Sequence, residues 1–250
     1  MAKFCTKCGK KLEDGEICSC EKEKKTTEAK EVRSTTERTT SSGTDFNWYV
    51  NSFIDIIKGI IVKPIDTIKK FSAEKYFTLG IIIIILNALL TGVMVYLVNE
   101  EAPGFISMML SLLGADSFSF GALFDVSFMK VLLYVALFML VGFGVSGLMI
   151  YVMAGPLFKT NISIKRVFAL IGTCATLTIL TTIVAIIAVY ISTKAFLVVL
   201  LLAGVLYLCH LYHGIQKISN IDENKQGYTF LVAVAVATFA VVYVLPKILF

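Results

Sequence analysis

Charge is scarce in this chain of 250 residues, and over long stretches it is absent. Only 16% of the residues are Asp, Glu, Lys or Arg, whereas a soluble domain carries about 25%. Between Phe77 and Pro246, five stretches of 21 to 28 residues contain none of the four. A helix of about 20 residues crosses the ~30 Å hydrocarbon core of a bilayer. The low charge therefore excludes a soluble globular protein and predicts an all-α integral membrane protein with five transmembrane helices.

Each predicted span lies within one uncharged stretch, and together the spans form a transmembrane domain over residues 77–250. We expect them at 77–98, 131–155, 167–191, 195–213 and 229–249. The second stretch is longer than one crossing needs, and Gly155–Pro156 is a natural place for that helix to leave the membrane. The apolar segment 105–113 is too short to cross, so we expect it to be re-entrant or to lie on the surface.

Positive charge is missing from one side of the predicted spans. Residues 99–127 contain no Lys or Arg, and only Lys130, Lys194 and Lys247 lie on that side. The ten basic residues on the other side are Lys58, Lys63, Lys69, Lys70, Lys75, Lys159, Lys165, Arg166, Lys217 and Lys225. Because basic residues stay in the cytoplasm, we expect a cell-membrane protein with a cytoplasmic N-terminus and an extracytoplasmic C-terminus. This asymmetry accounts for the net charge of +5 without nucleic acid.

An apolar run near Met1 is also missing, so we expect no cleavable signal peptide and assign the insertion signal to the first span. No Asp or Glu lies within any predicted span. Catalytic pairs and intramembrane proton relays need such groups, so we expect no enzymatic activity and identify no small-molecule substrate.

A few polar side chains do occur within the predicted spans. His210 and His213 lie one helical turn apart, with Cys209 beside them. A metal site or a proton relay is one interpretation, but we favour anchoring of these rings at headgroup level. Asn87 is the most isolated polar residue of the first span, and we expect it to make an interhelical hydrogen bond rather than to contact a substrate.

Four of the six cysteines lie within the first 20 residues, as Cys5-x-x-Cys8 and Cys18-x-Cys20. Four thiolates close a tetrahedral Zn²⁺ site and leave no position for a substrate. A reducing cytoplasm favours metal-bound thiols over disulfides. We therefore predict a structural zinc-ribbon over 1–20. The second pair fits less well, because one residue separates its cysteines where two are usual, and whether both ligate zinc stays open.

The segment between this ribbon and the first span has two parts. Residues 21–45 hold six basic and six acidic residues and two aliphatic ones, which is too little apolar surface to offset chain entropy. We expect a disordered linker there. Residues 46–76 are expected to form an amphipathic juxtamembrane helix, interrupted at Pro64. Such a helix lies in the interface with its lysines at anionic headgroups, or packs against the protein's own bundle; the sequence favours neither.

Two resemblances follow from these stretches. Residues 1–20, and KFCTKCGKKLEDGEICSC in particular, look like the short zinc-ribbon that heads many bacterial membrane proteins of unassigned function. Residues 46–250 resemble the Yip1 family in the amphipathic KPIDTIKKF (63–71), in the five closely spaced spans, and in Gly155-Pro156-Leu157-Phe158 followed by a short basic loop ending Ile164-Lys165-Arg166-Val167-Phe168. The resemblance implies five spans and a cytoplasmic N-terminus. Eukaryotic members act in vesicle traffic with Rab GTPases, but no residue of a GTPase-binding site carries over.

These features predict a non-enzymatic membrane scaffold or adaptor, whose ribbon binds a cytoplasmic protein partner or the protein's own subunits. The linker favours this interpretation, because it would hold a partner at high local concentration beside the membrane. Membrane lipids are the other expected partners. The alternative is a small-molecule or ion transporter or channel. Such a protein needs polar groups at mid-membrane, and the spans offer Asn87, Ser146 and scattered threonines.

Overall fold

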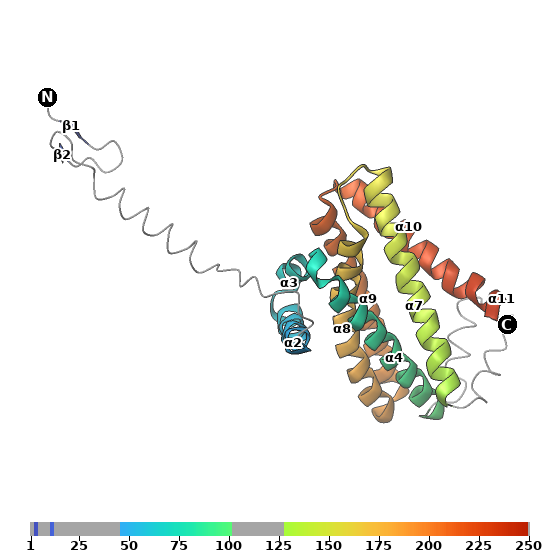
Figure 1. Cartoon of the computed structure of the whole chain (residues 1–250). Helices are drawn as coiled ribbons and strands as arrows, with labels where there is room; N and C mark the ends of the chain where they lie inside the picture. Colours follow the sequence, from blue (N-terminus) through green and yellow to red (C-terminus); the bar gives the residue numbers. More distant parts are fainter. Residues whose placement is uncertain (1–2, 5–10, 13–45, 102–127, 250) are drawn as a thin grey trace. The chain divides into compact units, whose positions relative to one another are not determined.

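The chain divides into two units, Met1–Asp45 and Phe46–Phe250. The computed structural model describes residues 3–4, 11–12, 46–101 and 128–249 of them (Figure 1). In the first unit, strand β1 (Lys3–Phe4) pairs antiparallel with β2 (Lys11–Leu12). The predicted linker 21–45 and the apolar segment 105–113 lie outside the described residues.

The described part of the second unit is helical (Figure 1). Its elements in chain order are α2 (Phe46–Val62), α3 (Pro64–Phe71), the 3₁₀ turn η1 (Glu74–Tyr76), α4 (Phe77–Glu101), α7 (Phe128–Val152), the π-turn η2 (Met153–Leu157), α8 (Ile164–Ile191), α9 (Thr193–Ser219), α10 (Glu223–Phe239), the π-turn η3 (Ala240–Val244) and α11 (Leu245–Leu249).

Five helical segments of the described residues are long and apolar enough to cross a membrane, with mean hydropathies of 2.3 to 2.7. They are Glu74–Glu101, Phe128–Leu157, Ile164–Ile191, Thr193–Ser219 and Glu223–Lys247. Large apolar side chains such as Leu201, Leu202 and Val205 of α9 are exposed, as expected where lipid is the solvent. The prediction of a helical protein with five such segments is confirmed.

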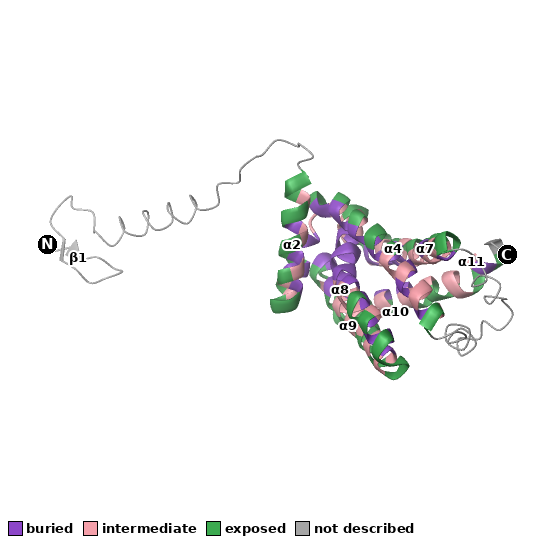
Figure 2. Cartoon of the chain, turned by 90° about the horizontal axis from the view of Figure 1, so that it is seen from below, coloured by how far each residue is buried: buried purple, intermediate pink, exposed green. Residues whose placement is uncertain are grey.

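Helices α4 and α8 lie side by side and run parallel. Gly80 of α4 lies 2.9 Å from Ala169 of α8, measured from an ideal Cβ to the Cα, and Asn87 reaches Thr178 further along both helices. Helix α7 returns along α4, α9 returns along α8, and α10 packs against α7 and α9. Buried side chains concentrate on α8, which lies at the centre of these contacts (Figure 2).

The segment before the first span folds into two helices, because Pro64 occupies the first turn of α3 and α2 ends two residues earlier, at Val62. Ile56 and Ile60 of α2 and Ile68 of α3 are buried in the main core cluster. Helix α2 is seen nearly end-on in Figure 1, where α8 and α9 are seen from the side, so it lies crosswise to them. Of the two alternatives for 46–76, packing against the protein's own bundle therefore holds for one face of this segment.

The second span ends in a π-turn that contains Pro156. Proline lacks an N–H, so the turn before it loses a donor. Further along, Thr160 closes the end of the turn, because its backbone N–H and its Oγ1 both donate to Ala154 O, the latter at 2.6 Å. The helix thus ends just beyond the expected exit at Gly155–Pro156.

Candidate functional site

The predicted zinc ligands Cys5, Cys8, Cys18 and Cys20 lie outside the described residues. Strands β1 and β2 flank the first pair in the sequence and hydrogen-bond to each other. The ligand set therefore stays a prediction.

The two histidines near the end of α9 point to different partners. His210 Nδ1 lies 2.6 Å from Leu206 O of its own helix, and His213 is exposed with its ring edge-on to Tyr212. Across 46–101 and 128–249 no three His, Cys, Asp or Glu side chains come together in a group that could hold a metal ion. The arrangement of these rings offers hydrogen bonding and aromatic contact at the end of the span.

The interhelical hydrogen bond expected of Asn87 is confirmed. Thr178 Oγ1 of α8 lies 2.9 Å from Asn87 Oδ1 and 2.7 Å from Ala175 O, and Asn87 is fully buried. Asn87 Nδ2 has no hydrogen-bond partner among the described residues. This side chain therefore ties α4 to α8 with a single hydrogen bond, while its amide NH₂ group finds no partner in the part of the chain that the structure describes.

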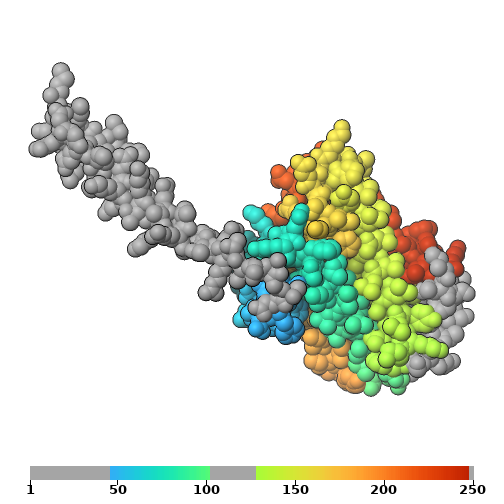
Figure 3. All heavy atoms as spheres, viewed as in Figure 1, coloured from blue at the N-terminus to red at the C-terminus, as the bar shows by residue number. Residues whose placement is uncertain are grey.

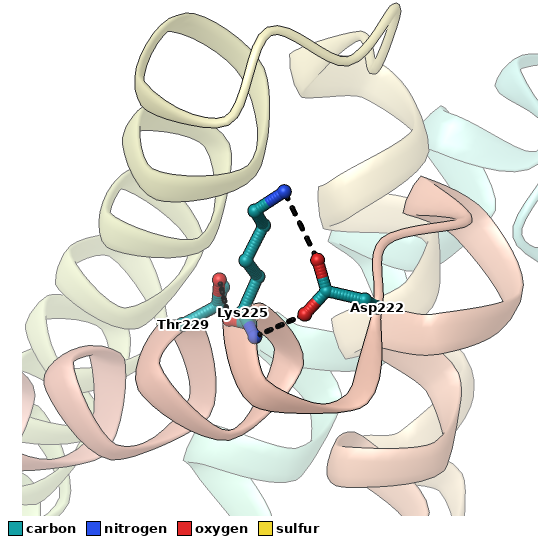
Figure 4. A network of polar contacts seen from close by, with 3 residues as sticks. All are labelled: Asp222, Lys225 and Thr229. Atoms are coloured by element: carbon teal, nitrogen blue, oxygen red, sulfur yellow. Dashed lines mark hydrogen bonds and ion pairs between the residues drawn. The ribbon is translucent and has the colours of Figure 1, made fainter.

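A second polar cluster closes the turn between α9 and α10 (Figure 4). Asp222 caps α10 and accepts a 3.0 Å hydrogen bond from the backbone N–H of Lys225. Its carboxylate also forms an ion pair with Lys225 Nζ, at 3.0 Å. The pKa of the Asp222 carboxyl lies below its usual 3.8. The larger cause is the hydrogen bond from the Lys225 backbone N–H, and the second is the contact with the Lys225 ammonium group. One turn on, buried Gln226 donates to Tyr212 O at 2.7 Å. The cluster fixes how α10 leaves α9.

An open groove of about 400 Å³ lies between α2 and α3. Its lining residues are Asp55, Lys58, Gly59, Val62, Lys63, Asp66, Thr67, Lys70 and Phe71. In Figure 3, α2 is the blue region at one edge of the unit. Helix α3 comes close to α2 at Gly59, where a Cβ would overlap the Thr67 side chain. The absence of a side chain at Gly59 therefore allows this close approach beside the groove.

Three lysines and two aspartates line this groove and give it a net charge of +1. The ammonium of Lys70 lies 4.0 Å from Asp55 Oδ2 and 4.7 Å from the centre of the Phe71 ring. Lys58 and Lys63 are exposed, and no side chain caps the start of α3 at Lys63. The arrangement can bind an anion. The sequence indicated a basic amphipathic segment but not the groove, which depends on the turn between the helices.

Comparison with known protein families matches residues 58–245 to the Yip1 domain, well over half of the chain. The match includes α3, the first four apolar segments, the fifth up to residue 245, and most of the groove lining. No curated protein and no solved structure matches the chain.

Proposed function

We propose, on the premise that this chain belongs to the Yip1 family, that it acts as a non-enzymatic membrane scaffold or adaptor. The supporting observation is how the bundle uses its polar side chains. Asn87 bonds to Thr178 and Gln226 to the backbone of Tyr212, so both join one helix to another. Charged residues of the described spans lie near the helix ends. A tightly joined bundle of this kind suits an anchor better than a pathway for a solute.

The cytoplasmic part of the proposal is a structural zinc-ribbon that binds a protein partner or another copy of the chain. Its four thiolates would be Cys5, Cys8, Cys18 and Cys20, with zinc serving only to hold the small fold together. The pairing of β1 with β2, on either side of the first cysteine pair in the sequence, supports this proposal.

The proposed orientation puts the N-terminus in the cytoplasm and the C-terminus outside the cell membrane. It rests on the basic residues at the helix ends. Lys165 and Arg166 begin α8, Lys217 lies in the last turn of α9, and Lys225 lies in the first turns of α10. These three ends belong to the same side of an alternating bundle.

Affinity purification from native membranes tests the adaptor role. We would compare the full-length protein with a Cys5→Ser/Cys8→Ser variant and with a matched Cys209→Ser control, which changes an exposed thiol of α9. The proposal expects the first variant to lose co-purifying proteins and bound zinc, and the control to keep both. An identical set of proteins from all three would contradict the adaptor role. Less than about half an equivalent of zinc per full-length chain would contradict a four-thiolate site.

Reconstitution into proteoliposomes tests the transporter alternative. A scaffold is expected to give ion and small-solute fluxes equal to those of protein-free vesicles. Selective flux that disappears in an Asn87→Leu variant would replace the scaffold proposal.

A further inference from the structure

Helix α2 has three distinct faces. Ser52, Ile56 and Ile60 point to the bundle and are buried. Polar residues including Asn51, Asp55 and Lys58 occupy another face. The third face is apolar but exposed: Phe46 is 76% exposed, Val50 38%, Ile54 40% and Ile61 66%. These four recur at spacings of four and seven residues, so they form one stripe along the helix.

An exposed apolar stripe of this size needs an apolar environment. The polar face beside it leads into the groove between α2 and α3. Five lysines and three acidic residues lie in 46–76, and three of those lysines line the groove. An apolar stripe next to a cationic groove matches the two parts of an anionic lipid, its acyl chains and its phosphate.

We propose that the groove between α2 and α3 binds the phosphate headgroup of an anionic phospholipid, while the exposed stripe of α2 lies among acyl chains of the same leaflet. The groove lysines Lys58, Lys63 and Lys70 contact the phosphate. Asp55 competes for Lys70, since the two already lie 4.0 Å apart. This inference goes beyond the scaffold role and does not depend on the zinc-ribbon.

Lipid fits the site better than a free anion or a protein segment. The groove is open and holds two carboxylates besides its lysines, so electrostatics alone would retain inorganic phosphate weakly. Helix α2 packs against α8, which is itself apolar enough to span a bilayer. A lipid can satisfy the stripe and the groove together, because its headgroup and acyl chains are covalently joined.

The sole tryptophan of the chain supplies a local probe. Trp48 lies in α2, is 39% exposed and stacks on Tyr76 at 5.6 Å between ring centroids. We would titrate full-length protein in neutral detergent micelles with phosphatidylglycerol or phosphatidylcholine carrying the same brominated chains, and follow quenching of Trp48. The wild type is expected to bind the anionic lipid at least about tenfold more tightly, since each nearby lysine adds about fivefold.

Two matched variants separate the groove from general surface charge. Lys58→Gln/Lys63→Gln/Lys70→Gln should lower affinity for phosphatidylglycerol at least about tenfold and leave that for phosphatidylcholine unchanged. Lys159→Gln/Lys165→Gln/Lys217→Gln removes the same charge from exposed positions elsewhere. This control should change the affinity for neither lipid by more than about twofold. Ile54→Asn/Ile61→Asn should weaken both lipids. Should the groove variant fail to fold, raising salt on the wild type is expected to weaken only phosphatidylglycerol.

Several results would overturn the proposal. Equal quenching by the two lipids in the wild type would remove the headgroup role. Equal losses in the two lysine variants would assign the preference to overall charge. Displacement of the lipid by millimolar inorganic phosphate would make the groove a free-anion site. Retained lipid binding together with loss of a co-purifying protein in the groove variant would assign the groove to a protein partner.

Discussion

At the scale of single residues, two glycines determine how closely α4 approaches α8. A Cβ at Gly80 would lie 2.9 Å from Phe168 O and from Ala169 Cα. A Cβ at Gly172 would overlap the backbone of Gly80. Each glycine faces backbone atoms of the other helix rather than a flexible side chain. A larger residue at either position therefore cannot be accommodated by a side-chain movement and has to displace the whole helix.

We predict that Gly172→Ala lowers the free energy of unfolding by about 1–3 kcal/mol, because overpacking separates α4 from α8. Thermal unfolding in detergent would measure it. The matched control is Gly204→Ala in α9, where a Cβ would meet nothing within 4 Å; it should be neutral or stabilising by up to about 1 kcal/mol. Equal melting temperatures for wild type and Gly172→Ala would show that the two helices are not in close contact.

The Asn87–Thr178 pair gives a second prediction at this scale. Thr178→Val should destabilise the protein because it leaves a buried amide with no partner. In an Asn87→Leu background the same change should cost little. The expected coupling in this double-mutant cycle is about 0.5–1.5 kcal/mol, the range for hydrogen bonds between membrane helices. Strictly additive effects in the same unfolding assay would contradict the hydrogen bond.

At the scale of elements, the ends of the helices are set by capping groups rather than by hydropathy. Helix α9 continues to Ser219, where Asn220 adopts the left-handed conformation with φ 52°, whereas the apolar pattern predicted an end at 213. Helix α10 begins at Glu223 after the cap Asp222, six residues before the predicted start. Helices therefore extend past the apolar core into polar segments with good caps.

The Asp222 cap makes the start of α10 sensitive to acid. Its pKa is below 3.8 in the folded protein because Lys225 donates to the ionised carboxylate, so the stabilisation is complete above pH 3.8 and is lost as pH falls through the lower folded value. We predict that the melting temperature of wild type exceeds that of Asp222→Asn by a constant amount from pH 7 to 5. The difference should shrink below pH 3.8. A difference that persists unchanged to pH 2.5 would rule out the ionised cap.

The number of apolar helices was predictable because charged side chains are excluded from hydrocarbon, and long uncharged stretches are easily recognised in a sequence. The break at Pro64 was predictable from proline's missing donor. Which faces meet was not predictable, because in lipid any face of an apolar helix is well solvated. Gly80 and Gly172 face each other between α4 and α8, for example, whereas Gly92 faces Leu132 of α7.

The groove could not be predicted from the sequence, for a related reason. Its lysines are visible as a basic segment, but their convergence depends on the turn at Lys63 and on the approach of Thr67 to Gly59. Periodicity describes one helix at a time and carries no information about the angle between two. The zinc ligands remain a sequence-based prediction.

At the scale of the whole molecule, each crossing carries the chain to the other side of the membrane, so consecutive turns lie on opposite sides. We predict that a membrane-impermeant maleimide labels Thr193→Cys in intact cells and labels Glu223→Cys only after permeabilisation. Both positions are exposed at helix starts, and both substitutions would be made with all six native cysteines replaced. Labelling of both in intact cells would contradict the proposed topology.

The parallel course of α4 and α8 has a consequence for biosynthesis. Two parallel neighbours need a third helix between them in the chain, and here that helix is α7. While a ribosome has delivered only α4 and α7, Asn87 lacks Thr178 and the Gly80 surface is uncovered. The centre of the bundle therefore assembles only after the third crossing leaves the translocon, and a nascent chain arrested before α8 should be a ready substrate for membrane quality-control proteases.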